Sequence, residues 1–439
     1  MEITRSNIQS KFARYVLPSV LTQLLSACYT VVDGFFIGRF TGDAGLAAVN
    51  LSWPVAAIIY ATAAGISTGG AVLIGNRLGA GKPEEAVKAR GTAITMLVLA
   101  GIFYAVTFTV LLPSLLTMLG AQGEVRVAAR EYLQVIIWGS MISMLSSGLT
   151  PLLRNFGRTV GVMAIMMISG FLNVCLDGFF VGVLHTGAKG AAYATMIAQS
   201  FSLTCSLCFL FRIREHPVHF SEFRIRLPEA KSILSIGLSP FGLYMASPIT
   251  LFITNWQCLR YGGNEALAAY AVAAYVTGAV GALLSGMGDG IQPLVSFAEG
   301  AKDHPAAKKV FNLAVRYSLA MAGTMTVITV ISRHFLGRVF GCGPDALNYL
   351  NAAMIITPLG YPLMGLCKLA SSYLYAGGDH RFASLLIYLD PLVMAPAMLL
   401  LMPVFFDVSG IWLSYPVAYL GMLLLTAALI SLHEKNRIG

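Results

Sequence analysis

Charged residues are scarce in this chain of 439 residues. Asp, Glu, Lys and Arg together make up 11% of it, whereas hydrophobic residues make up 57%. A soluble protein carries about 25% charged residues. The composition therefore excludes an ordinary soluble protein and indicates a chain that crosses a membrane many times.

Motifs of enzymatic chemistry are also missing. Residues 79–82 resemble the end of a phosphate-binding loop, but Asn76 stands where that loop needs glycine, and Pro83 follows the lysine. There is no nucleophile elbow and no His/Cys metal spacing, and Cys205-x-x-Cys208 has no second pair nearby. The net charge of +9 lies in short basic blocks between apolar runs, which is not a nucleic-acid signal. We expect no enzyme, no cofactor and no nucleic-acid partner.

Hydropathy predicts an all-α membrane protein with twelve spans in two six-helix bundles. The predicted organisation is an N-terminal lobe at 1–211, a linker at 212–231, which is the longest polar interruption, and a C-terminal lobe at 232–439. The expected spans are 13–38, 46–76, 91–117, 129–153, 159–184, 188–211, 232–259, 267–297, 310–332, 345–375, 382–406 and 410–432.

The two halves repeat at one ungapped offset of 221 residues. At this offset Gly65, Gly69, Gly79, Gly120 and Gly139 fall on Gly286, Gly290, Gly300, Gly341 and Gly360. Six spans per half give both halves the same orientation in the membrane. A parallel repeat of this kind predicts two pseudo-symmetric bundles with a central substrate cleft between them.

Basic residues predict the orientation, because loops on the cytoplasmic side carry an excess of Lys and Arg. With the amino terminus inside, most basic residues fall in cytoplasmic segments. The outer segments hold only Arg39, Arg126, Arg130, Lys189, Arg260, Arg333 and Arg338. We expect a multi-pass protein of the plasma membrane with both termini and the linker in the cytoplasm.

Two aspartates lie inside apolar spans of the first half. Asp33 follows Tyr29 by four residues, and Asp177 follows Asn173 by four, so each aspartate shares a helix face with its polar partner. A carboxylate in a membrane helix is costly and usually marks an ion or proton path. Both spans run outward and place the two acids at similar depth, where Thr195 could add a hydroxyl group. Repulsion and burial would favour a bound proton, although two structural aspartates remain the alternative.

The second half lacks acids at the equivalent positions, Thr254 and Met398, and has its own in-span charges. Lys368 could form a structural ion pair with Asp390 or Asp289, or these residues could belong to a substrate site. Methionine and aromatic side chains offer adaptable surface for aromatic cations, although each one alone is more typical of membrane core. The candidates for a substrate cleft are Asp289, Lys368, Asp390, Tyr244, Met245, Trp256, Met287 and Gln292.

Several sequence motifs together resemble a known family. They are Val32-Asp-Gly-Phe-Phe-Ile-Gly38 followed by Leu46-Ala-Ala-Val49, then Gly75-Asn-Arg-Leu-Gly-Ala-Gly-Lys82, Leu153-Arg-Asn-Phe-Gly-Arg158, Asn173-x-x-x-Asp177 and Gln292-Pro-Leu294. Over nearly the whole chain they resemble the multidrug and toxic compound extrusion (MATE) family, nearest its DinF-like and MepA-like branch.

The resemblance implies twelve helices in two lobes and drug efflux driven by inward proton or sodium flow. It also implies that a first-lobe cluster carries the coupling ion, here Tyr29, Asp33, Asn173, Asp177 and Thr195. The chain departs from NorM-like members, which have an acid in span 7, where this chain has Thr254, Asn255 and Gln257.

We therefore expect a monomeric antiporter that exports amphipathic organic cations. A proton is favoured over Na⁺ at Asp33 and Asp177, because sodium wants five or six oxygen ligands and two facing carboxylates suffice for a proton. The alternative is a flippase of the same superfamily for lipid-linked oligosaccharides. Such a flippase would be expected to carry several basic residues in its cavity, whereas only Lys368 lies clearly within a span.

Overall fold

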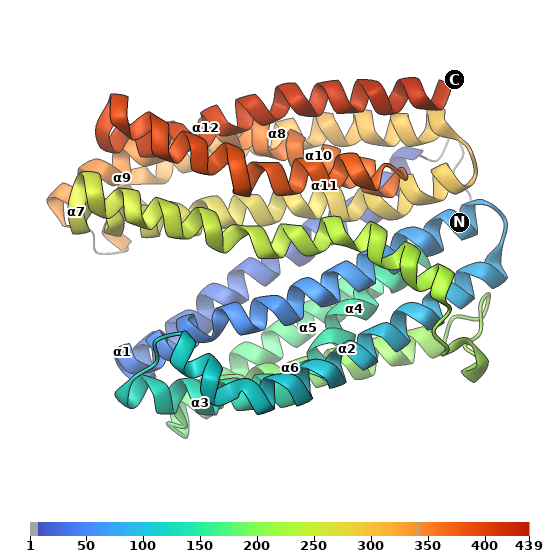
Figure 1. The fold of residues 1–439 in the computed structure, drawn as a ribbon, viewed down its shortest axis with the longest axis horizontal. Coiled ribbons are helices and arrows are strands. Elements are labelled where there is room, and N and C mark those ends of the chain that lie inside the picture. Colours follow the sequence, from blue (N-terminus) through green and yellow to red (C-terminus); the bar gives the residue numbers. More distant parts are fainter. Residues whose placement is uncertain (1–7, 340–342, 439) are drawn as a thin grey trace. The chain divides into compact units, whose positions relative to one another are not determined.

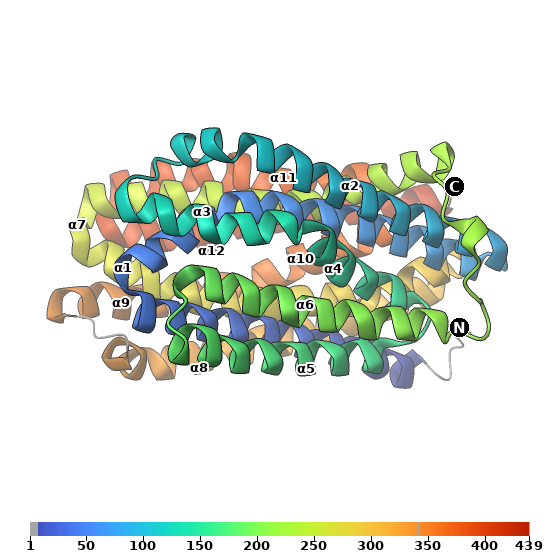
Figure 2. The same cartoon turned by 90° about the horizontal axis from the view of Figure 1, so that it is seen from below.

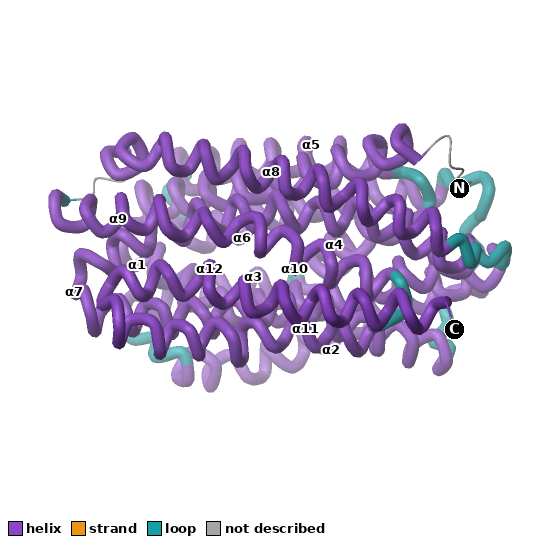
Figure 3. The backbone as a smooth tube through the Cα atoms, turned by 90° about the horizontal axis from the view of Figure 1, so that it is seen from above, coloured by secondary structure: helices purple, strands orange, loops and turns teal. Residues whose placement is uncertain are grey.

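The computed structural model describes residues 8–339 and 343–438, apart from the side chains of residues 29–31, 34, 35, 42–44, 46, 246–248, 338, 339 and 436–438. Every regular element in this part of the chain is helical, and no strand occurs in it, as predicted (Figure 3). The α-helices are α1 Ile8–Gly79, α2 Pro83–Met118, α3 Gly123–Trp138, α4 Ser140–Asn155, α5 Thr159–Asp177, α6 Gly187–Phe211, α7 Leu227–Gly300, α8 His304–Val339, α9 Pro344–Ile356, α10 Tyr361–Ala376, α11 His380–Leu389 and α12 Ala395–Ile438. Two π-helical segments, η1 Gly178–Val183 and η4 Asp390–Met394, and two 3₁₀ turns, η2 Phe220–Glu222 and η3 Thr357–Gly360, complete them.

Some of these helices are too long for one membrane span. The 72 residues of α1 would extend about 108 Å as one straight helix, against a hydrocarbon core of about 30 Å. The 74-residue α7 is broken at Gly263, where φ is 64°, and α12 is broken at Phe406 and Asp407. Figure 1 shows α1 and α7 each folding back on itself. The breaks at Gly263 and Asp407 fall where the sequence predicts loops between spans.

The described helices supply the predicted number of spans. By length and apolar composition, eight described helices could each cross a membrane, or nine when the bent pair α3 and α4 counts as one. Two of them, Leu227–Gly300 and His380–Lys435, contain the breaks just described and therefore provide two spans each. The limb of α1 before Ala47 contains the span that hydropathy predicts at 13–38, and it supplies one more. This brings the number of spans to twelve.

Close contacts divide the chain into two units that do not follow chain order. Unit 1 contains described residues 24–244, and unit 2 contains described residues 8–23 and 245–438. The first turns of α1 therefore pack in unit 2, and the first turns of α7 pack in unit 1. The division into lobes at 212–231 follows the order of spans along the chain and stays a prediction.

Each unit has its own layers of packed helices. In unit 1, α4 packs on α2 and α6, and α6 also contacts α3 and α5; Figure 2 shows α5 beside α6. In unit 2, α10 packs on α8, α11 and α12. One core of unit 2 surrounds Trp412 of α12, which is buried with Leu350 and Met354 of α9 and with Ala269 and Ala273 of α7.

Repeat-equivalent glycines make close helix contacts in both units. A β-carbon on Gly65 would lie 2.9 Å from the carbonyl oxygen of Gly237, and one on Gly69 would collide with the carbonyl oxygen of Ile233. In unit 2, β-carbons on the equivalent Gly286 and Gly290 would lie 2.7 and 2.5 Å from the Cα atoms of Val20 and Val16. Val16 is itself the equivalent of Gly237 at the 221-residue offset. Small residues permit such backbone approach between membrane helices. The glycines therefore hold two exchanged segments: the first turns of α1, which pack in unit 2, and the first turns of α7, which pack in unit 1.

The linker is fastened to unit 1 by a buried ion pair. Arg90 of α2 is 0% exposed and Glu222 of η2 is 3% exposed. The guanidinium group donates to both carboxylate oxygens, from Nε at 3.0 Å and from Nη2 at 2.8 Å. It also donates to the carbonyl oxygens of His216, from Nη1 at 3.0 Å, and of Pro217, from Nη2 at 3.2 Å, and its Cζ atom lies 5.2 Å from the ring centroid of Phe156. The linker, residues 212–231, is therefore bound to the start of α2, and we refer to it below as the linker strap.

Replacement of a contact glycine should destabilise the fold. Gly69→Ala places a methyl group against the backbone of Ile233, and overpacking of this kind costs about 1–3 kcal/mol. Thermal unfolding in detergent should show a lower midpoint. Gly278→Ala is the matched control, because its β-carbon meets no atom within 4 Å, and helical Gly→Ala otherwise stabilises by about 0.5–1 kcal/mol. Equal midpoints for the two variants would contradict the packing role of Gly69.

Removal of one partner of the buried ion pair should cost more than removal of both. Arg90→Gln leaves Glu222 buried without its partner, at a cost of about 3–5 kcal/mol, whereas the double variant Arg90→Met/Glu222→Met should recover most of that loss. Unfolding midpoints measure both effects. Arg214→Gln, in an exposed part of the same linker, should change little, and a similar loss there would show that linker charge in general is responsible.

Candidate functional site

Asp33 and Asp177 come from two helices of unit 1 and face each other. Asp33 lies on α1, and Asp177 is the last residue of α5. Their carboxyl groups are close enough to share a hydrogen bond once one of them carries a proton. Asp177 is 0% exposed, and Asp33 is partly buried. The two acids that the sequence singles out are therefore neighbours.

The buried oxygens of this pair lack donors. Neither carboxylate oxygen of Asp177 nor Oδ1 of Asp33 has a hydrogen-bond partner among the described residues. The amide nitrogen of Asn173, one turn before Asp177, is also buried and unpaired within the described residues. Most buried polar atoms in proteins are hydrogen-bonded. At the carboxylate oxygens a proton or a cation would restore the missing interactions, whereas the amide nitrogen of Asn173 needs an acceptor.

A π-helical turn follows Asp177 directly. Segment η1 begins at Gly178, and the π-helical segment η4 in unit 2 begins at Asp390. A π-turn widens the helix, disturbs the regular backbone ladder and is frequent at functional sites. The spans that carry η1 and η4 are equivalent in the repeat. Each unit therefore has an aspartate at a widened turn of its own copy of this span. Sequence reasoning missed these turns, because no residue pattern in the spans distinguishes π from α geometry.

A polar network of unit 1 lies near the carboxylate pair. Gln199 of α6 donates to the hydroxyl oxygen of Tyr60 at 3.0 Å and accepts from Ser143 of α4 at 2.6 Å. Tyr60, on α1, is close enough to Asp33 for the two to interact electrostatically. Sequence reasoning missed this trio, although a glutamine in an apolar span is a visible signal, and Gln199 lies one turn from Thr195.

The other predicted members of the cluster are less closely tied to the pair. Thr195 is half-buried on α6, and the described contacts include none between its hydroxyl group and either aspartate. The side chain of Tyr29 lies outside the described residues. Within the described residues, no group of three or more His, Cys, Asp or Glu side chains could hold a metal ion.

Unit 2 contains a second polar cluster. Lys368 of α10 donates to Ser285 of α7 at 2.9 Å, and Gln23 of α1 donates to Asp289 at 2.8 Å. Lys368 lies within electrostatic reach of both Asp289 and Asp390. The hydroxyl group of Tyr419 lies within hydrogen-bonding reach of Asp390. The structure thus gathers the three charges that the sequence singles out and adds Gln23, Ser285 and Tyr419.

The remaining cleft candidates differ in exposure. Met287 and Gln292 of α7 are buried, and Gln292 donates to Ser296 at 3.3 Å. Tyr244 and Trp256 are exposed, and the Arg260 guanidinium group lies 5.5 Å from the Trp256 ring centroid. Met245 is half-buried. Their role in binding a substrate stays a prediction.

Comparisons with known proteins agree over nearly the whole chain. The "Probable multidrug resistance protein YoeA" of Bacillus subtilis is 24% identical over 433 residues, which are 96% of this chain and 93% of that protein. The "Multidrug export protein MepA" of Staphylococcus haemolyticus is 22% identical over 409 residues, 93% of this chain and 90% of that protein.

Two solved structures share the fold at 22% identity. "Crystal structure of MATE in complex with MaL6" matches with a TM-score of 0.92 over 98% of this chain and 97% of that one. "Outward-facing conformation of a multidrug resistance MATE family transporter of the MOP superfamily" matches with a TM-score of 0.91 over 99% and 100%. The MatE family model matches residues 18–178 and 243–395, the greater part of both halves of the repeat. The chain therefore belongs to the MatE family, which its sequence motifs already resemble.

Proposed function

We propose that this chain is an antiporter that exports amphipathic organic cations in exchange for protons. The observation that carries the proposal is the pair Asp33 and Asp177, two facing carboxyl groups on different helices, whose buried oxygens lack hydrogen-bond donors within the described residues. The relatives named as multidrug resistance and multidrug export proteins support the substrate class.

The pair has the chemistry of a proton switch. Two ionised carboxylates that face each other in apolar surroundings repel and are poorly solvated, so the arrangement favours one shared proton. Because Asp33 lies on α1 and Asp177 on α5, loss of that proton pushes the two helices apart, and its return allows them to approach. A proton that binds the two arrangements with different affinity shifts the balance between them. Proton binding is thereby converted into helix movement within unit 1.

A proton fits the donor set better than sodium. Sodium would need about five or six oxygen ligands at one point, a demand similar to that of the other hard cations. The described side chains near the pair offer the carboxylates and the amide oxygen of Asn173 on the preceding turn. Two facing carboxylates already complete a proton site, so the proposal assigns the proton as the coupling ion, with no other cofactor.

The in-span charges suit a cationic substrate. Well inside the predicted spans, the four acids Asp33, Asp177, Asp289 and Asp390 outnumber the basic residues Arg316 and Lys368, so this part of the spans carries a negative balance that attracts cations. Proton and drug then compete for negative charge, directly or through helix movement, and this linkage is the basis of antiport. With the basic loop residues on the cytoplasmic side, the proposal places a monomer in the plasma membrane with both termini inside.

Neutralisation of Asp33 or Asp177 should abolish coupled transport without unfolding the protein. In proteoliposomes with an imposed pH gradient, Asp33→Asn and Asp177→Asn should reduce ethidium transport to the rate of protein-free vesicles. The unfolding midpoint should stay equal or rise, because the change removes an unpaired buried charge. Glu124→Gln, at an exposed carboxylate at the start of α3, should transport like the unmodified chain.

Full gradient-driven transport by Asp33→Asn would sink this assignment of the coupling site. If the unmodified chain transports no organic cation at all but moves a lipid-linked oligosaccharide across the vesicle bilayer, the flippase alternative replaces the proposed substrate class.

The identity of the coupling ion has its own test. A pH gradient at equal sodium concentration should drive ethidium transport, and a sodium gradient at equal pH should not, because the pair lacks enough oxygen ligands for sodium. The reverse pattern would assign sodium instead. Asp289→Asn serves as the comparison, because its carboxylate lies in unit 2 and accepts from Gln23, so loss of that group should leave the ion preference unchanged.

A further inference from the structure

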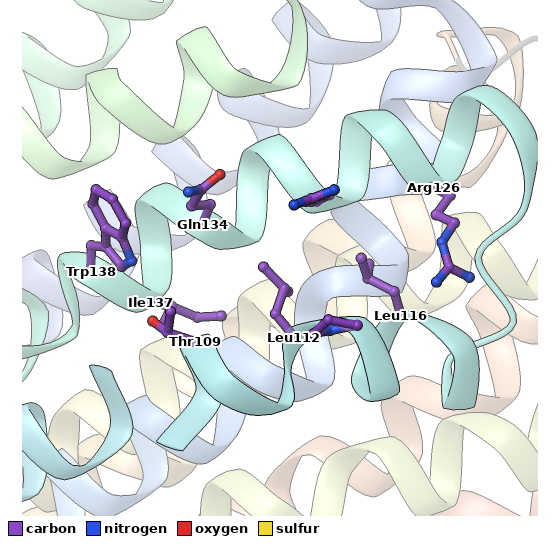
Figure 4. A pocket seen from close by; sticks show the side chains of 9 residues that line it. Thr109, Leu112, Leu116, Arg126, Gln134, Ile137 and Trp138 are labelled. Atoms are coloured by element: carbon purple, nitrogen blue, oxygen red, sulfur yellow. The ribbon is translucent and has the colours of Figure 1, made fainter. Parts of the chain in front are cut away.

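A pocket lies between the last turns of α2 and the length of α3 in unit 1, and neither aspartate of the carboxylate pair lines it. Its volume is about 190 Å³. Figure 4 shows Arg126, Gln134 and Trp138 along α3, with Leu112 and Leu116 of α2 facing them. The linker strap contacts the beginning of α2, so the pocket lies toward the opposite end of the bundle.

The α3 side of this pocket is a polar stripe. Arg126, Arg130, Gln134 and Trp138 all line it, and they follow one another at intervals of four residues. This spacing places them on one helix face. From Arg126 to Trp138 the stripe runs about 18 Å along the axis, somewhat more than half of the hydrocarbon thickness of a bilayer, which is about 30 Å. The α2 side is apolar, so the pocket combines two fixed cations at one end with an apolar wall.

Among the residues whose side chains the structure describes, no carboxylate balances the two arginines. Within the described residues, neither Arg126 nor Arg130 forms an ion pair. Arg126 donates a hydrogen bond from Nη2 to the hydroxyl oxygen of Thr117 at 3.3 Å. Glu131 follows Arg130 by one residue and points about 100° away around the helix, and Glu124 points further still from Arg126. The facing part of α2 carries no acid, and neither do α4 and α6, which pack near α3. The pocket is therefore complementary to an anion.

The arginines are not required by the repeated fold. At the 221-residue offset, the stripe corresponds to Leu347, Asn351, Ile355 and Leu359, none of which is charged. In unit 2 the equivalent of Leu116 is Gly337, and the side chain of Leu347 lies directly over it. The same gap is thus filled by protein in unit 2, whereas in unit 1 it stays open and positively charged.

The surroundings of the pocket are those of a lipid-facing surface. Val110, Met118, Val127 and Trp138 are 72%, 77%, 62% and 64% exposed around it. Large apolar side chains at this exposure, on spans that cross a membrane, face lipid. We propose that the pocket binds an anionic phospholipid, with its phosphate on Arg126 and Arg130 and part of an acyl chain along Leu112 and Leu116.

Native mass spectrometry of the full chain in detergent, titrated with phosphatidylglycerol, tests the site. Each basic residue near a membrane surface contributes about 1 kcal/mol to the binding of anionic lipid, roughly fivefold in affinity. Arg126→Gln/Arg130→Gln should therefore weaken phosphatidylglycerol retention roughly 25-fold and leave phosphatidylcholine retention unchanged. Arg224→Gln/Lys231→Gln removes two exposed basic residues of the linker, which lie in unit 1 and outside this pocket, and should leave both unchanged.

Two further variants keep the test decisive if the double glutamine variant folds poorly. Gln134→Glu leaves both arginines in place and adds one carboxylate to the exposed stripe, so it should weaken phosphatidylglycerol retention roughly fivefold. Arg126→Lys/Arg130→Lys keeps the charge and should retain most of the affinity.

Three outcomes would overturn the proposal. The first is equal loss in the control pair Arg224→Gln/Lys231→Gln, which would indicate unspecific attraction. The second is unchanged affinity in Gln134→Glu. The third is that inorganic phosphate alone displaces phosphatidylglycerol at equal concentration, which would make the pocket a site for a small free anion rather than a lipid.

Discussion

The free-energy cost of an unpaired polar group in an apolar medium determines where the helices, their breaks and the polar side chains of this protein lie. Within a bilayer each backbone group must find its partner inside the protein, so the spans are helices, and the breaks at Gly263 and Asp407 are confined to the ends of spans. Most polar side chains in the spans follow the same rule and find a hydrogen-bond partner within the protein. Ser and Thr hydroxyl groups in the spans donate to carbonyl oxygens one turn earlier, as at Ser19, Ser52 and Thr254. Asp33 and Asp177 are conspicuous because they break this rule together.

The repeat determines the scaffold, while the chemistry differs between the two units. Gly65 and Gly69 keep their counterparts Gly286 and Gly290, and each pair receives a helix segment from the other half of the chain. The acids do not keep counterparts, since Thr254 and Met398 stand at the positions equivalent to Asp33 and Asp177. Packing leaves no choice at such a glycine, because the methyl group of any larger residue would collide with the backbone of the neighbouring helix. A polar site needs only a buried position with room for a charge, so each unit can place its own groups on the same frame.

Sequence reasoning succeeded where one helix carries the whole signal. The four-residue spacing in Asn173-x-x-x-Asp177 depends only on helical geometry, and the ends of spans near Gly263 and Asp407 follow from hydropathy. It failed where the partner lies far away in the chain. Nothing near Arg90 indicates that it pairs with Glu222, 132 residues later. Likewise, the hydrogen bond between Gln23 and Asp289 joins residues 266 positions apart. Such contacts depend on which helix faces meet, and a single sequence contains no direct record of that.

The helix that carries Asp33 is divided between the two units. The described part of α1 before Leu24 packs in unit 2, where Gln23 is bound to Asp289 and Val16 and Val20 are held against glycines. The part that carries Asp33 packs in unit 1 beside α5. A single helix is therefore anchored at one end by close backbone contact, which has no dependence on charge. At the other end Asp33 meets the carboxyl group of Asp177. In the proposed mechanism, a change of protonation would therefore act on the part of α1 that lies in unit 1, while close glycine contacts, which do not depend on charge, hold the part that lies in unit 2.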